Sequence, residues 1–300
     1  MTYVEIVGNS RTEPQHLSSG EQAMLYRDMD QASLDAAYNN SAAVGPRQQT
    51  YFADWKTRSE AIARKIPVKR DLRYGEGPRQ RFDFFPCGQT GAPTLLFIHG
   101  GYWQMGDKEQ FSFIAAGPLS RGINVAAIEY SLAPAIRMDG IVAEIRLAMA
   151  WIVRHLGDLD AATDGAYIAG HSAGGHLTAM MMTEPGIKGA IAISGLFDLE
   201  PIRLCYLNHK LGMDGAEAQR NSPLLHLPAT APPLIIAVGG SELPELRRQS
   251  EEYSRAWTAS GLNARFLALS GHDHFSILEE LATPAGKLTA MLADLIRGKI

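Results

Sequence analysis

The chain contains little cysteine, and its two cysteines, Cys87 and Cys205, lie far apart with no CxxC pair. This spacing argues against a disulfide-stabilised scaffold and against a zinc–cysteine cluster. Long apolar runs are also missing, because no stretch reaches the roughly 18 apolar residues that a membrane-spanning helix needs. The opening MTYVEIVGNSRTEPQ lacks the charged head and apolar core of a signal peptide. We therefore expect a cytoplasmic protein with no membrane partner.

An excess of basic charge is absent too. The 28 Lys and Arg residues are outnumbered by 32 Asp and Glu residues, which gives a formal net charge of -4. No basic surface is therefore expected for nucleic acid or anionic lipid. What remains is an ordinary soluble composition, with 46% hydrophobic and 20% charged residues over 300 positions. No internal repeat or low-complexity segment appears.

The chain divides into two regions of different texture. Residues 1–66 are polar and favour helix, and we expect an N-terminal helical extension that caps the main domain, residues 67–300. The main domain opens with two strand-like runs, 68–74 and 80–86, separated by Gly and Pro, which predicts an antiparallel hairpin.

Short, continuously apolar runs then alternate with helix-length segments. Such runs are typical of strands buried on both faces of a parallel sheet, and the alternation predicts βαβ units. The fold class is therefore α/β, with a mostly parallel central sheet flanked by helices. The predicted strands are 94–98, 123–130, 165–170, 189–194, 233–239 and 264–269.

One serine stands between small residues at a predicted strand-to-helix turn, in Gly170-His171-Ser172-Ala173-Gly174. A G-x-S-x-G turn in this context is typical of a nucleophile elbow, which exposes the serine hydroxyl at the edge of the sheet. Glycines are expected there because neighbouring backbone approaches closely. The alternative is a plain glycine turn. This motif, however, has the flanking strand and helix that a nucleophile elbow requires.

A second glycine motif, HGGYW at 99–103, follows the predicted strand 94–98. Backbone N–H groups in such a loop can face a small anion, as a tetrahedral acyl intermediate requires. The candidate oxyanion donors are the N–H groups of Gly101, Tyr102 and Ala173. The alternative is a tight turn that packs two aromatic side chains.

A serine nucleophile needs a histidine base, and the sequence offers His272 and His274 near the C-terminus. We prefer His274, which precedes Phe275 and a helical run. His171 and His176 fall outside the chain order Ser, acid, His that such a fold uses, and we expect them to pack locally. A metal site is disfavoured because no third or fourth ligand has suitable spacing.

The third member of a triad is a carboxylate between the nucleophile and the base. Glu242 lies closest to the end of the predicted strand 233–239 and is our choice. Glu245 is expected to begin the following helix, where a carboxylate suits the helix dipole. Asp198, which follows another strand, is the fallback acid.

Taken together, HGGYW, GHSAGGHL, ISGLFDL, ELPELRRQS and HDHF resemble the α/β-hydrolase fold, and more narrowly its kynurenine formamidase (arylformamidase) branch near the hormone-sensitive-lipase-type esterases. YSLAP at 130–134 is similar to a segment of that esterase group. The resemblance covers roughly Val68 to Leu281 and implies Ser172 as nucleophile, Glu242 as acid and His274 as base. The acid in that branch is commonly aspartate, whereas this chain has glutamate.

The resemblance implies a serine hydrolase that cleaves a small acyl amide or ester, with no cofactor and no metal. Arylformamidase activity on N-formylkynurenine-type substrates is expected, with a general short-chain carboxylesterase as the alternative and a non-catalytic binding module as a third hypothesis. The expected partner is a small-molecule substrate, and a homodimer is left open. The expected substrate-binding residues are Tyr102, Trp103, Tyr206 and Phe275.

Overall fold

The computed structural model describes residues 24–300. An eight-stranded sheet in the order β1-β2-β4-β3-β5-β6-β7-β8 forms its centre. The strands are β1 (Lys69–Arg73), β2 (Arg81–Phe85), β3 (Thr94–Ile98), β4 (Asn124–Ile128), β5 (Ala166–His171), β6 (Ile187–Ile193), β7 (Leu234–Gly239) and β8 (Ala264–Leu269). Strands β3 to β8 pair in parallel, whereas β2 is antiparallel to both β1 and β4. The predicted hairpin and the predicted parallel sheet are both confirmed.

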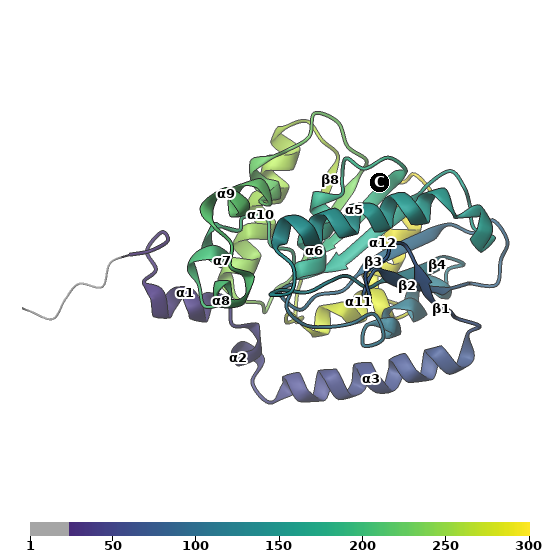
Figure 1. Ribbon diagram of the computed structural model, residues 1–300, viewed down its shortest axis with the longest axis horizontal. Helices are drawn as coiled ribbons and strands as arrows, with labels where there is room; N and C mark the ends of the chain where they lie inside the picture. The colour runs from purple at the N-terminus through teal and green to yellow at the C-terminus, as the bar shows by residue number, and fades with distance from the viewer. Residues whose placement is uncertain (1–23) are drawn as a thin grey trace, which may run out of the picture.

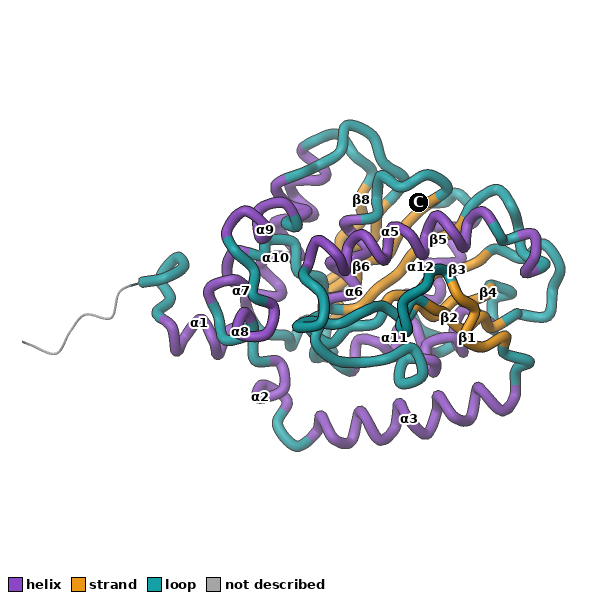
Figure 2. The backbone as a smooth tube through the Cα atoms, in the orientation of Figure 1, coloured by secondary structure: helices purple, strands orange, loops and turns teal. Residues whose placement is uncertain are grey.

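Helices cover both faces of this sheet, as Figures 1 and 2 show. The helices that follow the hairpin are α4 (Ala116–Leu119), α5 (Met138–Arg154), α6 (Ala173–Met180), α7 (Glu200–Leu204), α8 (Asn208–Leu211), α9 (Gly215–Arg220), α10 (Pro244–Ala259), α11 (Glu279–Ala282) and α12 (Lys287–Ile296). Short 3-10 helices are η1 (Ser112–Ala115), η2 (Gly157–Leu159), η3 (Pro223–Leu225) and η4 (Ser276–Leu278). In the described part of the chain, every helix is too short or too polar to traverse a bilayer.

The apolar core is split by the sheet into two layers, because successive side chains of a strand point to opposite faces. In β3, Leu96 and Ile98 join the layer that includes residues of α5, α6 and α10. Leu95 and Phe97 of the same strand join the layer that includes residues of α11 and α12. All four side chains are at most 1% exposed. Burial on both faces explains why these strands read as unbroken apolar runs.

Three helices precede the sheet: α1 (Gln31–Ala37), α2 (Asn40–Val44) and α3 (Arg47–Lys65). In Figure 1, α3 runs along one side of the molecule, and its Trp55 is only 1% exposed. Trp55 stacks on Phe113 at 5.2 Å between ring centroids and contacts Phe275 at 6.0 Å. The Tyr51 hydroxyl donates to Asp273 at 2.9 Å, so α3 is joined to the loop after β8. A separate extension that ends at residue 66 stays a prediction.

Parallel strands place their carboxyl ends at one edge of a sheet, where ligands bind in open α/β folds. The loop 99–106 follows β3, Ser172 follows β5, Glu242 follows β7 and His274 follows β8. The topology thus brings together residues that are up to 175 positions apart in the sequence.

Candidate active site

Ser172 occupies a one-residue turn between a strand and a helix. Strand β5 ends at His171 and α6 begins at Ala173, so the helix starts earlier than the predicted five-residue turn allowed. The backbone of Ser172 has φ 57° and ψ −116°, which is a strained conformation for a residue with a Cβ. Such strain is typical of a nucleophile elbow, because it lifts the side chain clear of both flanking elements.

The glycines around Ser172 are required by close backbone contacts. A Cβ on Gly170 would lie 2.1 Å from the Gly174 carbonyl oxygen. A Cβ on Gly174 would lie 2.0 Å from the carbonyl oxygen of Ile98, at the end of β3. Neither contact leaves room for a side chain, and the expected close approach of backbone at this turn is therefore observed.

His274 and Glu242 form a buried pair. His274 Nδ1 lies 2.7 Å from Glu242 Oε2, and the two residues are 5% and 6% exposed. The other carboxylate oxygen, Oε1, accepts from the Ser194 hydroxyl at 2.6 Å and from the Gly239 N–H at 2.7 Å. Because an ionised carboxylate can only accept, the proton sits on His274 Nδ1, and Nε2 carries a lone pair. This is the tautomer that a general base needs.

The alternative acids are engaged elsewhere. Glu245 accepts from the Tyr38 hydroxyl at 3.0 Å and pairs with Arg248 at 2.7 Å. Asp198 accepts from the Tyr26 hydroxyl at 2.7 Å. Both carboxylates therefore lie in other hydrogen-bond networks, and the carboxylate that meets His274 is Glu242.

The alternative base also has other partners. His272 Nε2 contacts Glu280 Oε1 at 2.9 Å, and His272 Nδ1 lies 3.1 Å from the Ser276 carbonyl oxygen. Its ring thus faces the segment that follows the loop, and it does not line the cavity that contains Ser172.

Ser172 and His274 line one cavity of about 470 Å³, within the size range of small-molecule sites. Among residues 24–300, no hydrogen bond joins the Ser172 hydroxyl to His274. Unliganded enzymes often show long catalytic hydrogen bonds that shorten only when substrate binds. The structure therefore brings the three residues expected to form the triad to one site.

The loop after β3 carries three consecutive residues at positive φ: Gly101 at 115°, Tyr102 at 48° and Trp103 at 57°. A Cβ on Gly101 would lie 2.1 Å from the Met105 carbonyl oxygen, so glycine is required there. Within the described residues, the N–H groups of Gly101 and Tyr102 donate to no other backbone group. The Ala173 N–H is free because it belongs to the first turn of α6. These N–H groups are available to an oxyanion.

The expected aromatic wall is only partly observed. Tyr102, Tyr206 and Phe275 line the cavity. Trp103 does not, because it is 0% exposed and packs edge-on against His176 at 5.0 Å between ring centroids. Trp103 was expected to bind substrate, but its indole lies in the core and is not part of the cavity wall.

Further cavity residues were missed by sequence reasoning. Asn40, Phe52 and Trp55 come from the N-terminal helices and line the same space as Ser172. The sequence indicated that these residues lie in helices. It did not indicate which part of the sheet those helices pack against.

His171 was also missed as a contact of the candidate base. Its Nε2 donates to the carbonyl oxygen of His274 at 2.7 Å, and the two rings lie 4.6 Å apart. Burial holds the pKa of His171 well below its usual range, and the nearby His274 lowers this pKa further. A neutral His171 therefore packs beneath His274 and holds the backbone of that residue.

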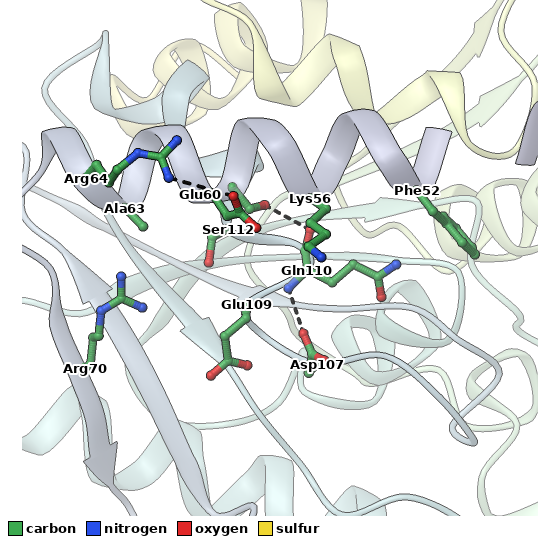
Figure 3. Close-up of a pocket in the computed structure, with 11 residues that line it drawn as sticks. Phe52, Lys56, Glu60, Ala63, Arg64, Arg70, Asp107, Glu109, Gln110 and Ser112 are labelled. Carbon is green, nitrogen blue, oxygen red and sulfur yellow. Dashed lines mark hydrogen bonds and ion pairs between the residues drawn. The ribbon is translucent and has the colours of Figure 1, made fainter. Parts of the chain in front are cut away.

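A larger cavity of about 620 Å³ lies between α3 and residues 107–112 (Figure 3). Its walls carry charges of both signs, including Lys56, Glu60, Arg64 and Glu109. Several of these are already paired with neighbours, for instance Arg64 with Glu60 at 3.7 Å. None of the three residues expected to form the triad lines this space, and the smaller cavity is therefore the candidate active site.

Comparison with known proteins agrees with this geometry. The family model BD-FAE matches residues 84–192. Kynurenine formamidase of Danio rerio is 35% identical over 295 residues, which cover 90% of this chain and 98% of that protein. A candidate thioesterase from Silicibacter sp. TM1040 superposes with a TM-score of 0.78 at 32% identity, over 86% of this chain and 97% of that one.

A more distant structure shows the fold alone. The carboxylesterase EstE1, cloned from a metagenomic library, has a TM-score of 0.68 at 20% identity, over 83% of this chain and 96% of that one. The expected α/β-hydrolase fold is thereby confirmed. Because the relatives are named as hydrolases, an enzyme is confirmed over a binding module. The chain belongs to the kynurenine formamidase family.

Proposed function

We propose that the protein hydrolyses aryl formamides of the N-formylkynurenine type through an acyl-enzyme on Ser172. The observation that carries this proposal is the buried Glu242–His274 pair beside the cavity that contains Ser172. The 35% identity to a kynurenine formamidase over nearly its whole length supports the choice of substrate. Tyr102, Tyr206 and Phe275 give the cavity aromatic surface for an aryl leaving group.

In the proposed mechanism, the Ser172 oxygen attacks the formyl carbon while His274 Nε2 takes the hydroxyl proton. Glu242 keeps the imidazole in the required tautomer and stabilises the imidazolium. The N–H groups of Gly101, Tyr102 and Ala173 stabilise the oxyanion, each by on the order of 3 kcal/mol in the barrier.

Collapse of this intermediate breaks the C–N bond, and His274 delivers its proton to the departing aniline nitrogen. Water then attacks formyl-Ser172 and gives a proton to His274. Formate leaves as the proton returns to the Ser172 oxygen. Each step uses only acid–base and nucleophilic groups of this chain.

A short-chain carboxylesterase is the second candidate, because the same triad cleaves esters and the superposable solved structures include a carboxylesterase. The two functions differ in the leaving group and in the length of acyl chain that the cavity accepts. A substrate series therefore separates them.

We expect kcat/KM to be highest for the formyl group and to fall as the acyl chain lengthens. The measurement compares an N-formyl anilide with acetyl, butyryl and octanoyl esters of one phenol. The expected order follows from the family, whose named relative acts on a formyl group. It also follows from the size of the cavity, because an aryl leaving group occupies part of it and leaves less room for a long acyl chain. A maximum at octanoyl without formamide turnover would make a general carboxylesterase the better description.

We expect Glu242→Gln to lower kcat by about four orders of magnitude, because an amide stabilises the wrong tautomer of His274 and no imidazolium. The matched control is Glu245→Gln, which alters a carboxylate of the network around Arg248. That control is expected to lower the melting temperature and to leave most of kcat. The measurement is kcat for an aryl formate in both variants. A larger loss of kcat in Glu245→Gln than in Glu242→Gln would identify Glu245 as the acid.

A further inference from the structure

Asn40, the first residue of α2, lies in the wall between two cavities. Its side chain borders the cavity that contains Ser172 and an adjoining cavity of about 220 Å³ that Glu242 and His274 line. Asn40 is only 4% exposed. A polar side chain buried this deeply is expected to have a partner for each end of its amide.

The hydrogen bonds of Tyr102 fix which way the Asn40 amide points. The Tyr102 hydroxyl donates to the Tyr38 carbonyl oxygen at 2.7 Å, and a carbonyl oxygen can only accept. The Tyr102 oxygen is therefore left as an acceptor, and Asn40 Nδ2 donates to it at 3.0 Å. The opposite end of the amide is Oδ1, which is buried with no partner among the described residues.

Two cavity-lining side chains carry such an unpartnered buried acceptor, Asn40 through Oδ1 and His171 through Nδ1. His171 Nδ1 lies on the oxyanion side, 3.1 Å from where a Cβ on Gly100 would be. Asn40 borders the adjoining cavity of His274 and Glu242 instead. His274, which protonates the leaving group in the proposed mechanism, lines both of these cavities together with Asn40, so Asn40 lies near the residue that delivers the proton.

We infer that Asn40 Oδ1 accepts a hydrogen bond from the N–H of the scissile amide, and that this contact makes the site favour amides over matched esters. The inference rests on the proposed function and names the determinant of its leaving-group preference. An amide nitrogen brings a donor to Oδ1. An ester oxygen brings only lone pairs and leaves Oδ1 unpaired. Sites built to bond a substrate N–H discriminate strongly against analogues that lack it.

The same contact orients the reacting nitrogen. When Oδ1 holds the existing N–H, the nitrogen lone pair that develops as the C–N bond breaks is turned toward His274. The nitrogen gains a proton from His274 and leaves as a neutral amine. Asn40 is therefore a specificity-determining residue that touches the leaving group, and its amide donates and accepts without changing protonation state.

The test compares formanilide with phenyl formate, which differ only in N–H against O at the scissile bond. Asn40→Leu removes the acceptor at similar volume, and Asn40→Ala is the second variant if leucine lowers the melting temperature. We expect kcat/KM for formanilide to fall about 10- to 100-fold, the range for an unpaired buried polar group. After subtraction of the uncatalysed rate, phenyl formate turnover is expected to change less than about threefold.

Tyr102→Phe separates direct contact from positioning, because it removes the hydroxyl that orients the Asn40 amide and retains the acceptor Oδ1 itself. If Asn40 acted only by holding Tyr102, both Asn40→Leu and Tyr102→Phe would reduce amide and ester turnover equally. That result would overturn the inference. So would an unchanged amide-to-ester ratio in Asn40→Leu, or a wild-type enzyme that hydrolyses phenyl formate but not formanilide.

Failure of the proposed function would look different. A wild-type enzyme that turns over neither formyl substrate would refute arylformamidase activity. The amide-to-ester ratio would then be measured with acetanilide and phenyl acetate, and the same fall in Asn40→Leu would support the contact with the amide N–H. An unchanged ratio in that pair would overturn it.

Discussion

Ser172→Ala is expected to lower kcat for an aryl formate by about five to six orders of magnitude, the loss that follows removal of a triad nucleophile. Only the hydroxyl can form the acyl-enzyme. Ser194 also follows a strand at positive φ, but its hydroxyl donates to Glu242 Oε1 at 2.6 Å. Residual turnover would come from the oxyanion donors and from substrate binding. Single-turnover kinetics with a chromogenic aryl ester measure this loss.

The fold is expected to survive this substitution. The Ser172 hydroxyl makes no hydrogen bond with another residue in 24–300, so alanine leaves no buried partner unpaired. The melting temperature should therefore stay within a few degrees of the wild-type value. Near-full activity in a folded Ser172→Ala protein would refute the serine-hydrolase mechanism.

His274→Ala is expected to cost nearly as much as Ser172→Ala, because the base and the nucleophile act as a unit. The double variant should lose little more than either single variant. His272→Ala is the matched control two residues away, and its ring bonds Glu280 outside the cavity. It should retain most of kcat, and a loss confined to His272→Ala would reassign the base.

Much of the fold could be predicted because its strands are buried on both faces. Runs such as 94–98 and 233–239 have no polar face, and only a covered parallel sheet accommodates several of them in series. Chain order then placed Ser172, Glu242 and His274 at one edge of that sheet. The choice of Glu242 over Glu245 depended on distance from the strand end, and the structure brings Glu242 to the imidazole.

Side-chain direction in loops could not be predicted. Trp103 and Tyr102 are neighbours with similar chemistry, yet one ring is buried in the core and the other lines the cavity. Both residues have positive φ, which is rare for aromatic residues, and the sequence did not indicate this backbone conformation. The position of Asn40 could not be predicted for another reason. It lies at the start of α2, and the sequence does not show that this helix packs beside Ser172, which is far away along the chain.

The contacts between α3 and the segment after β8 determine when during synthesis this part of the molecule can fold. Tyr51 and Asp273 are 222 positions apart, and Arg58 reaches Glu279 across 221 positions. A ribosome therefore releases α3 long before its partners exist. The aromatic side chains of Phe52 and Trp55 lack their partner Phe275 until the ribosome has reached that residue. Contacts of such long range form late and slowly. The candidate active site, which is lined by Asn40 and Phe52 as well as His274, is complete only after His274 has been synthesised.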